Sequence, residues 1–115
     1  MPETLRPRER IRKQNDFTAL YKKGKRYRGK YFILINHPNK LGFSRFAVVA
    51  SKKTGSAVKR NRIKRRMRAL FRRNKNHLII PMDLIAIAKA GLSSAPCKDL
   101  EEEYLKAVDI ITRKY

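Results

Sequence analysis

The sequence is poor in cysteine and in apolar segments, and both shortages limit what kind of protein it can be. Its one cysteine, Cys97, has no second cysteine with which to form an internal disulfide. No apolar segment reaches the roughly 18 residues of a membrane-spanning helix. The first six residues lack the apolar core of a signal peptide. Together these features predict a cytoplasmic protein in a reducing compartment.

Negative charge is the third shortage. Thirty Lys and Arg residues stand against nine Asp and Glu, which gives a formal net charge of +21. No acidic residue occurs between Asp16 and Asp83, although that interval holds twenty of the thirty basic residues. Such a charge repels itself in a compact fold, and a polyanion relieves the repulsion. Nucleic acid is the expected partner, because each neutralised phosphate releases condensed counterions. A solvated basic face and a membrane surface are the alternatives.

The sequence also lacks a convincing catalytic site. His37 and His77 fall in predicted loops, with no carboxylate or nucleophile at a useful spacing for acid–base catalysis. Cys97 has no metal-binding partner. The acidic run 101–103 suits the positive start of a helix better than a metal cluster. We therefore predict no cofactor in the protein itself, and a self-contained nuclease is disfavoured.

What is present predicts one α+β domain over residues 1–115. Residues 1–13 are expected to be extended or partly disordered. Asn15 or Asp16 is expected to cap a first helix that ends before Gly24. The remaining elements are strands at 28–36 and 43–51, a helix at 57–73, a strand at 83–88, and a last helix from Asp99. The order α-β-β-α-β-α predicts a two-layer α/β sandwich.

The two longer helices carry the clearest local signals. Ser56 is a good cap for the helix at 57–73, and Ile63, Met67, Leu70 and Phe71 form its apolar stripe. Asp99, followed by Glu102 three residues later, has the pattern of a capping box for the last helix.

The helix at 57–73 is also the strongest functional signal. Nine of its residues from 59 to 73 are Lys or Arg. Like charges three or four residues apart repel, and the total here is roughly 1–3 kcal/mol. Selection for stability alone would have placed glutamate among them. Arginine outnumbers lysine, which favours forked phosphate contacts. A basic amphipathic helix lying on a membrane is the alternative.

Residues 53–65 carry a specific motif, in which Arg60-Asn61-Arg62 lies between a Lys-x-Gly-x-Ala-Val lead and a further basic turn. This segment resembles the signature of the protein subunit of bacterial ribonuclease P. The flanks match as well, at residues 15–17, 48–53 and 85–89. In order, spacing and length the resemblance extends from about Arg6 to Tyr115.

The resemblance implies a fold and a function that the residues alone do not supply. The fold would be the ribosomal protein S5 domain 2-like fold, with a left-handed βαβ crossover against the usual right-handed rule. The protein would bind a catalytic RNA, and the holoenzyme would remove the 5′ leader of precursor tRNA. The RNA subunit would carry the chemistry with divalent metal ions, magnesium above all. No membrane or protein partner is implied, and a structural RNA binder such as a ribosomal protein is the rival.

The resemblance also assigns residues to two surfaces. The contacts to the catalytic RNA would be Lys59, Arg60, Asn61, Arg62, Lys64, Arg65 and Arg68. A cleft for the single-stranded leader would hold Phe17, Tyr21, Lys52, Lys53 and Lys89. Aromatic rings stack on unpaired bases. On the residues alone, core packing explains Phe17 and Tyr21 equally well. The family often has Phe where this chain has Tyr21, a mild departure because the ring is kept.

Overall fold

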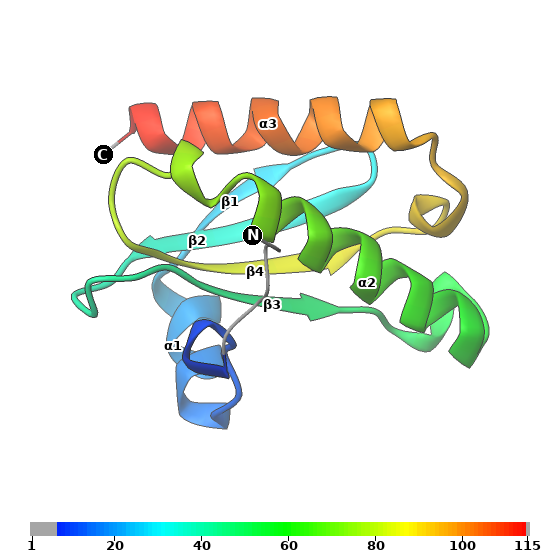
Figure 1. Ribbon diagram of the computed structural model, residues 1–115. Coiled ribbons are helices and arrows are strands. Elements are labelled where there is room, and N and C mark those ends of the chain that lie inside the picture. Colours follow the sequence, from blue (N-terminus) through cyan, green and yellow to red (C-terminus); the bar gives the residue numbers. More distant parts are fainter. Residues whose placement is uncertain (1–6, 115) are drawn as a thin grey trace.

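A four-stranded sheet with the strand order β1-β2-β4-β3 organises the molecule, as seen in the computed structural model, which describes residues 7–114 (Figure 1). The elements are α1 (Gln14–Lys23), β1 (Lys25–Arg28), β2 (Phe32–Pro38), β3 (Arg45–Val49), α2 (Ala57–Arg73), β4 (Met82–Ala88) and α3 (Cys97–Arg113). The strand β2 is antiparallel to both of its neighbours, β1 and β4, while β3 is parallel to β4.

Helices cover both faces of this sheet. Figure 1 shows α2 and α3 on one side and α1 on the other. The larger core lies under α2 and α3, where the rings of Phe46 and Phe71 stack with centroids 4.7 Å apart. A smaller core joins Leu20 of α1 to Ile35 and Ile85 of the sheet. The α+β class is confirmed, and α1 adds a partial third layer to the expected two-layer sandwich.

The helix α2 has the predicted bounds, for the predicted reasons. The Ser56 side chain accepts a hydrogen bond from the Lys59 backbone N–H at 3.3 Å. The apolar stripe is fully buried, through Ile63, Met67, Leu70 and Phe71. Since α2 joins the parallel neighbours β3 and β4, the βαβ unit that the resemblance implies is present. Its handedness and the fold name stay predictions.

The strand β1 is the element that the sequence prediction missed. The segment Lys25–Arg28 has no apolar alternation, because it is a polar strand at the edge of the sheet. The predicted strand at 28–36 is in fact the end of β1, a turn and most of β2. Glu103 fixes this turn, since its carboxylate accepts the Lys30 N–H at 2.8 Å and the Tyr31 N–H at 3.0 Å. Glu103 was expected only to suit the positive start of the last helix, and the structure adds this second role.

Two predicted helix starts are also wrong. The helix α3 begins at Cys97 after Pro96, so Asp99 lies inside the first turn and not at the N-cap position. Proline is tolerated here because the groups at a helix start need no N–H for an intrahelical hydrogen bond. The helix α1 begins at Gln14, so Asn15 and Asp16 lie inside it, and no side chain of the described residues caps it. It ends as predicted at Gly24, whose N–H donates to the Leu20 carbonyl at 2.8 Å.

The segment before α1 follows β3 closely. Pro7–Glu9 forms a 3-10 turn, and Arg10 makes an isolated parallel bridge with Phe46. Ile11 is buried in the smaller core. Part of the predicted extended segment 1–13 is thus ordered against the sheet, while residues 1–6 lie outside the described residues. Within the described range, no helix is long and apolar enough to cross a membrane.

Candidate nucleic-acid interface

The predicted RNA-binding residues of α2 share one continuous surface. Lys59, Asn61, Arg62 and Arg65 are exposed, while Arg60, Lys64 and Arg68 are half-buried. Their distribution follows from helix geometry, because the apolar stripe turns the opposite face toward solvent. The half-buried residues lie four apart, which places them in one row along a flank of the helix. Among the described residues, the Nε atom of Arg60 is buried without a hydrogen-bond partner.

The other flank of α2 uses its charges for structure. Arg66 donates from Nη1 to the Leu92 and Ser93 carbonyls, at 2.8 and 3.0 Å, and from Nη2 to the Ala95 carbonyl. Arg73 forms an ion pair with Glu101 of α3 at 3.4 Å. These two arginines therefore hold the loop before α3, and α3 itself, against α2. The structure separates them from the arginines of the exposed face, a division that composition alone could not reveal.

This division predicts different outcomes for neighbouring arginines. Replacing Arg66 with alanine should lower the free energy of unfolding by about 2 kcal/mol, because carbonyls of the loop lose a charged donor. Replacing Arg65 should leave stability nearly unchanged. Thermal or urea unfolding of both variants measures the difference. A stability loss for Arg65→Ala as large as that for Arg66→Ala would contradict the assignment.

The predicted leader-binding residues lie around the sheet face that α1 covers. Phe17 packs against the smaller core, whereas Tyr21 is 39% exposed near the end of α1. Lys52 and Lys53 are exposed in a short turn after β3, and Lys89 directly follows β4. Because β3 and β4 are parallel, their carboxyl ends lie at the same edge of the sheet. The lysines are thereby brought to one end of the sheet, although separated in sequence.

A half-covered apolar row leads across the sheet to these lysines. Ile33 pairs with Ile87, which pairs with Val49, so the three side chains lie on one face of the sheet. They share this face with Ile35 and Ile85 under α1, two residues away in register. The inner pair is fully buried, whereas the outer row is only partly covered. The sheet thus presents apolar surface beside α1, and basic residues stand at its end.

Two arginines of β1 belong to the same face, and the sequence prediction missed both. By register, Arg26 lies beside Ile35 and Arg28 beside Ile33. Arg26 also donates from Nη2 to the Tyr21 carbonyl at 3.2 Å, which links β1 to the end of α1. Their period-two spacing was the one available signal, and it was lost because the strand itself was not recognised.

Lys89 has a structural partner as well as a place at this surface. Its Nζ donates to the Gly29 carbonyl, and its backbone N–H donates to the Tyr31 carbonyl at 2.9 Å. The side chain is half-buried. Lys89 therefore closes the end of the β1–β2 hairpin, and two of its ammonium protons remain for other acceptors.

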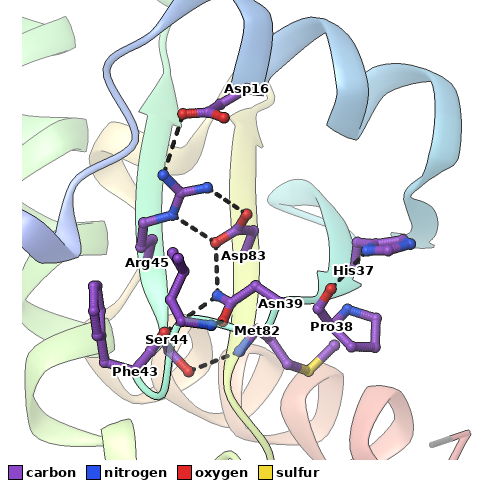
Figure 2. Close-up of polar contacts among 10 residues, drawn as sticks. Asp16, His37, Pro38, Asn39, Phe43, Ser44, Arg45, Met82 and Asp83 are labelled. Atoms are coloured by element: carbon purple, nitrogen blue, oxygen red, sulfur yellow. Dashed lines mark hydrogen bonds and ion pairs between the residues drawn. The ribbon is translucent and has the colours of Figure 1, made fainter.

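The two acidic residues that bound the acid-free interval meet at one arginine (Figure 2). Arg45 donates to both carboxylate oxygens of Asp83, at 2.8 and 2.6 Å, and to Asp16 at 3.2 Å. Asn39 adds a hydrogen bond to Asp83 at 2.8 Å. The hydrogen bonds to Asp83 raise the pKa of Arg45 above its ordinary value. This cluster ties the start of α1, where Phe17 follows Asp16, to β3 and β4.

Removing Asp83 should therefore be costly. The side chains of Arg45 and Asp83 are only 17% and 12% exposed, so Asp83→Ala leaves a nearly buried guanidinium without its main partner. We expect a loss of roughly 3–5 kcal/mol in the free energy of unfolding. Asp16 is 33% exposed, and Asp16→Ala should cost about 1 kcal/mol or less.

A double-mutant cycle separates this pair from general disruption. Adding Arg45→Met to Asp83→Ala removes the unpaired charge and should restore part of the loss. Urea unfolding measures all of these variants. Strictly additive losses for the two substitutions would show that the pair has no coupling.

The remaining candidates are the two histidines and the cysteine. His37 lies in β2, not in a loop as predicted, and its Nδ1 is 2.7 Å from the Pro38 carbonyl oxygen. His77 is exposed, as expected of a surface histidine. Cys97 is exposed, with its sulfur 3.7 Å from Nη2 of Arg66. From residue 7 to residue 114, no group of three His, Cys, Asp or Glu side chains could hold a metal ion.

Comparisons with known proteins agree on one family. The family described as Ribonuclease P matches residues 5–112. A protein of Syntrophus aciditrophicus named "Ribonuclease P protein component" is 42% identical over 100 residues, covering 87% of this chain and 84% of its own length. A protein of the same name from Thermotoga maritima is 38% identical over 93 residues, with 81% and 80% covered. The solved RNase P protein of Staphylococcus aureus has a TM-score of 0.81 and 32% identity, covering 90% of this chain and 94% of that one.

Proposed function

Because the chain belongs to the ribonuclease P protein family, we propose that it works through two RNA-binding surfaces, α2 and the sheet face beside α1. The chain is the protein subunit of ribonuclease P and assists 5′ processing of tRNA. The RNA subunit carries the catalysis. The division of labour between the two surfaces is the part that this chain's own geometry addresses.

The first surface, the exposed face of α2, binds the catalytic RNA. The observation that carries this proposal is that Lys59, Arg62 and Arg65 are exposed with no carboxylate partner among the described residues, while Arg66 and Arg73 are engaged with the loop before α3 and with Glu101. Guanidinium groups free of internal partners can make forked contacts to phosphate. Asn61, exposed between Arg60 and Arg62, can both donate to and accept from RNA.

The second surface, the sheet face beside α1, binds the single-stranded leader of precursor tRNA. Tyr21 offers a ring for stacking, and the row of Ile33, Val49 and Ile87 offers apolar area on the sheet face that α1 partly covers. Lys52 and Lys53 stand at the end of this row, where they can follow the backbone of the strand. This combination of rings and cations binds single strands with little dependence on sequence.

Several further assignments complete the proposal. Divalent metal, chiefly magnesium, acts with the RNA subunit, and this protein contributes cations that lower the repulsion between RNA strands. The partners are the catalytic RNA and precursor tRNA. The place of action is the cytoplasm, where tRNA is made in bacteria.

Reconstitution tests the proposal. The purified protein alone should not cut precursor tRNA, whereas adding it to the matching catalytic RNA at modest magnesium should promote removal of the leader. The protein's cations replace part of the counterion requirement, so its effect should shrink as magnesium or salt rises. A cleavage rate that the protein leaves unchanged at low magnesium and low salt would contradict the proposal. Co-sedimentation of the protein with ribosomes, without any effect on tRNA maturation, would contradict it as well.

A further inference from the structure

A small hollow lies at the outer edge of the sheet, where β3 is the last strand. It has a volume of about 170 Å³, and Phe46, Ala47 and Val48 of β3 line it. Arginines from two separate segments also line it: Arg10 and Arg12 from the segment before α1, and Arg68 from α2. Phe17 of α1 completes the wall. The hollow therefore lies between the two surfaces described above.

The segment that carries Arg10 and Arg12 is anchored at this edge. Ile11, between them, is only 5% exposed and belongs to the smaller core. Its backbone N–H donates to the Phe46 carbonyl at 3.2 Å, and Arg10 forms the bridge to the same residue. Both arginines are thus held beside the hollow by backbone contacts.

None of the three arginines has an ion pair or a side-chain hydrogen bond within residues 7–114. Arg45 and Arg66, which are half-buried like Arg68, are both fully engaged. Partial burial, together with the charges of Arg10 and Arg72, lowers the pKa of Arg68. Cations gathered around one hollow without a carboxylate repel one another, and a bound anion removes that repulsion.

We propose that Arg10, Arg12 and Arg68 together bind one phosphodiester group of RNA in this hollow. The inference rests on the proposed function and adds to it a site that joins the two surfaces. Guanidinium groups are suited to this ligand, because their planar forks match phosphate oxygens. Phe17 lies in the same hollow, where a base next to the bound phosphate can contact its ring.

The flank of α2 leads to the same place. Arg60, Lys64 and Arg68 lie four residues apart, so their side chains form a row about 5–6 Å from one to the next. The row begins within the Arg60-Asn61-Arg62 motif and ends at the hollow. A strand of RNA that follows it reaches Arg10 and Arg12 at its end, and the phosphate can belong either to the catalytic RNA or to the leader.

Two binding assays with three variants test the site and identify the strand. The variants are Arg10→Gln with Arg12→Gln, Arg68→Gln, and all three changes together. One assay measures the affinity of the protein for catalytic RNA across a range of salt. The other measures the affinity of the holoenzyme for mature tRNA and for precursors with leaders of increasing length.

If the site binds a phosphate of the leader, we expect the variants to lose about tenfold in affinity for precursor with a long leader. Their affinities for mature tRNA and for catalytic RNA should then be unchanged. If the site binds a phosphate of the catalytic RNA, we expect the same loss of affinity in the first assay. The affinity for catalytic RNA should then also depend less steeply on salt. In either case the triple variant should lose less than the product of the separate losses, because all three arginines bind one group. Arg68→Lys, which keeps the charge without the fork, should fall between wild type and Arg68→Gln.

Arg113→Gln is the matched control, since it removes one exposed arginine at the far end of α3. Melting curves of the Gln variants establish that they fold. Losses no larger than that of the control in both assays, with a wild-type protein that assists cleavage, would overturn the site alone. A wild-type protein that neither binds catalytic RNA nor assists cleavage would overturn the proposed function beneath it.

Discussion

Replacing Arg60 and Arg62 with alanine is expected to weaken binding of the catalytic RNA by roughly 10- to 100-fold at moderate salt. Arg62 lies on the exposed face of α2. Arg60 is half-buried, and its Nε has no hydrogen-bond partner among the described residues. Within residues 7–114, neither arginine has a side-chain hydrogen bond or ion pair whose loss would unfold the protein. The dependence of log affinity on log salt should flatten by about one unit for each lost phosphate contact.

The matched comparison removes two arginines elsewhere. Arg66 is unsuitable because it holds the loop before α3, so Arg28 and Arg113, exposed on β1 and at the end of α3, are the better controls. Their joint loss changes net charge by the same amount and should leave the slope for catalytic RNA nearly intact. Unchanged affinity and slope in the Arg60, Arg62 variant would show that α2 is not the interface.

Replacing Tyr21 with alanine is expected to reduce the preference of the holoenzyme for precursor over mature tRNA by about tenfold. Loss of one stacked base costs roughly 1–3 kcal/mol, and only the precursor has a leader to stack. Tyr21 is a better probe than Phe17, because Phe17 also packs against the smaller core and its loss would mix stability with binding. Affinities of the two tRNA forms, measured side by side, give the ratio.

Tyr21→Phe is the control that the chain itself suggests. It keeps the ring and removes only the hydroxyl, so the preference for precursor should be preserved. Binding of the catalytic RNA should be the same in all three proteins. Equal losses for precursor and mature tRNA in Tyr21→Ala would count against a leader-binding surface beside α1.

Local signals in the sequence were enough to predict the helix α2. Its cap, Ser56, directly precedes the helix and its apolar stripe runs along it, so both bounds could be predicted from neighbouring residues. The strand β1 is the opposite case. Its polar residues become a strand only because β2 offers a free edge, and the turn between them depends on Glu103, more than seventy residues away. No local pattern contains that information.

The candidate interface likewise has a part that the sequence alone could predict and a part that it could not. The basic helix is contiguous in sequence, so its charge was visible at once. The role of Arg66 could not be seen in the sequence, because its partners are the carbonyls of a loop 26 to 29 residues further along. The meeting of Asp16, Arg45 and Asp83 is similarly hidden, since 29 and 38 residues separate Arg45 from its two partners. Charge position predicted a surface, and only the fold assigns each charge to structure or to binding.

Photocrosslinking from the two surfaces tests directly whether α2 and the sheet face beside α1 bind different RNA strands. A benzophenone amino acid is placed at the position of Arg65 in one protein and of Tyr21 in another, both exposed. Each is irradiated in a holoenzyme bound to precursor tRNA with labelled leader. We expect the first to crosslink to the catalytic RNA and the second to the leader. Exchange of the two products, or crosslinks to the same strand from both positions, would show that the two surfaces do not bind separate strands.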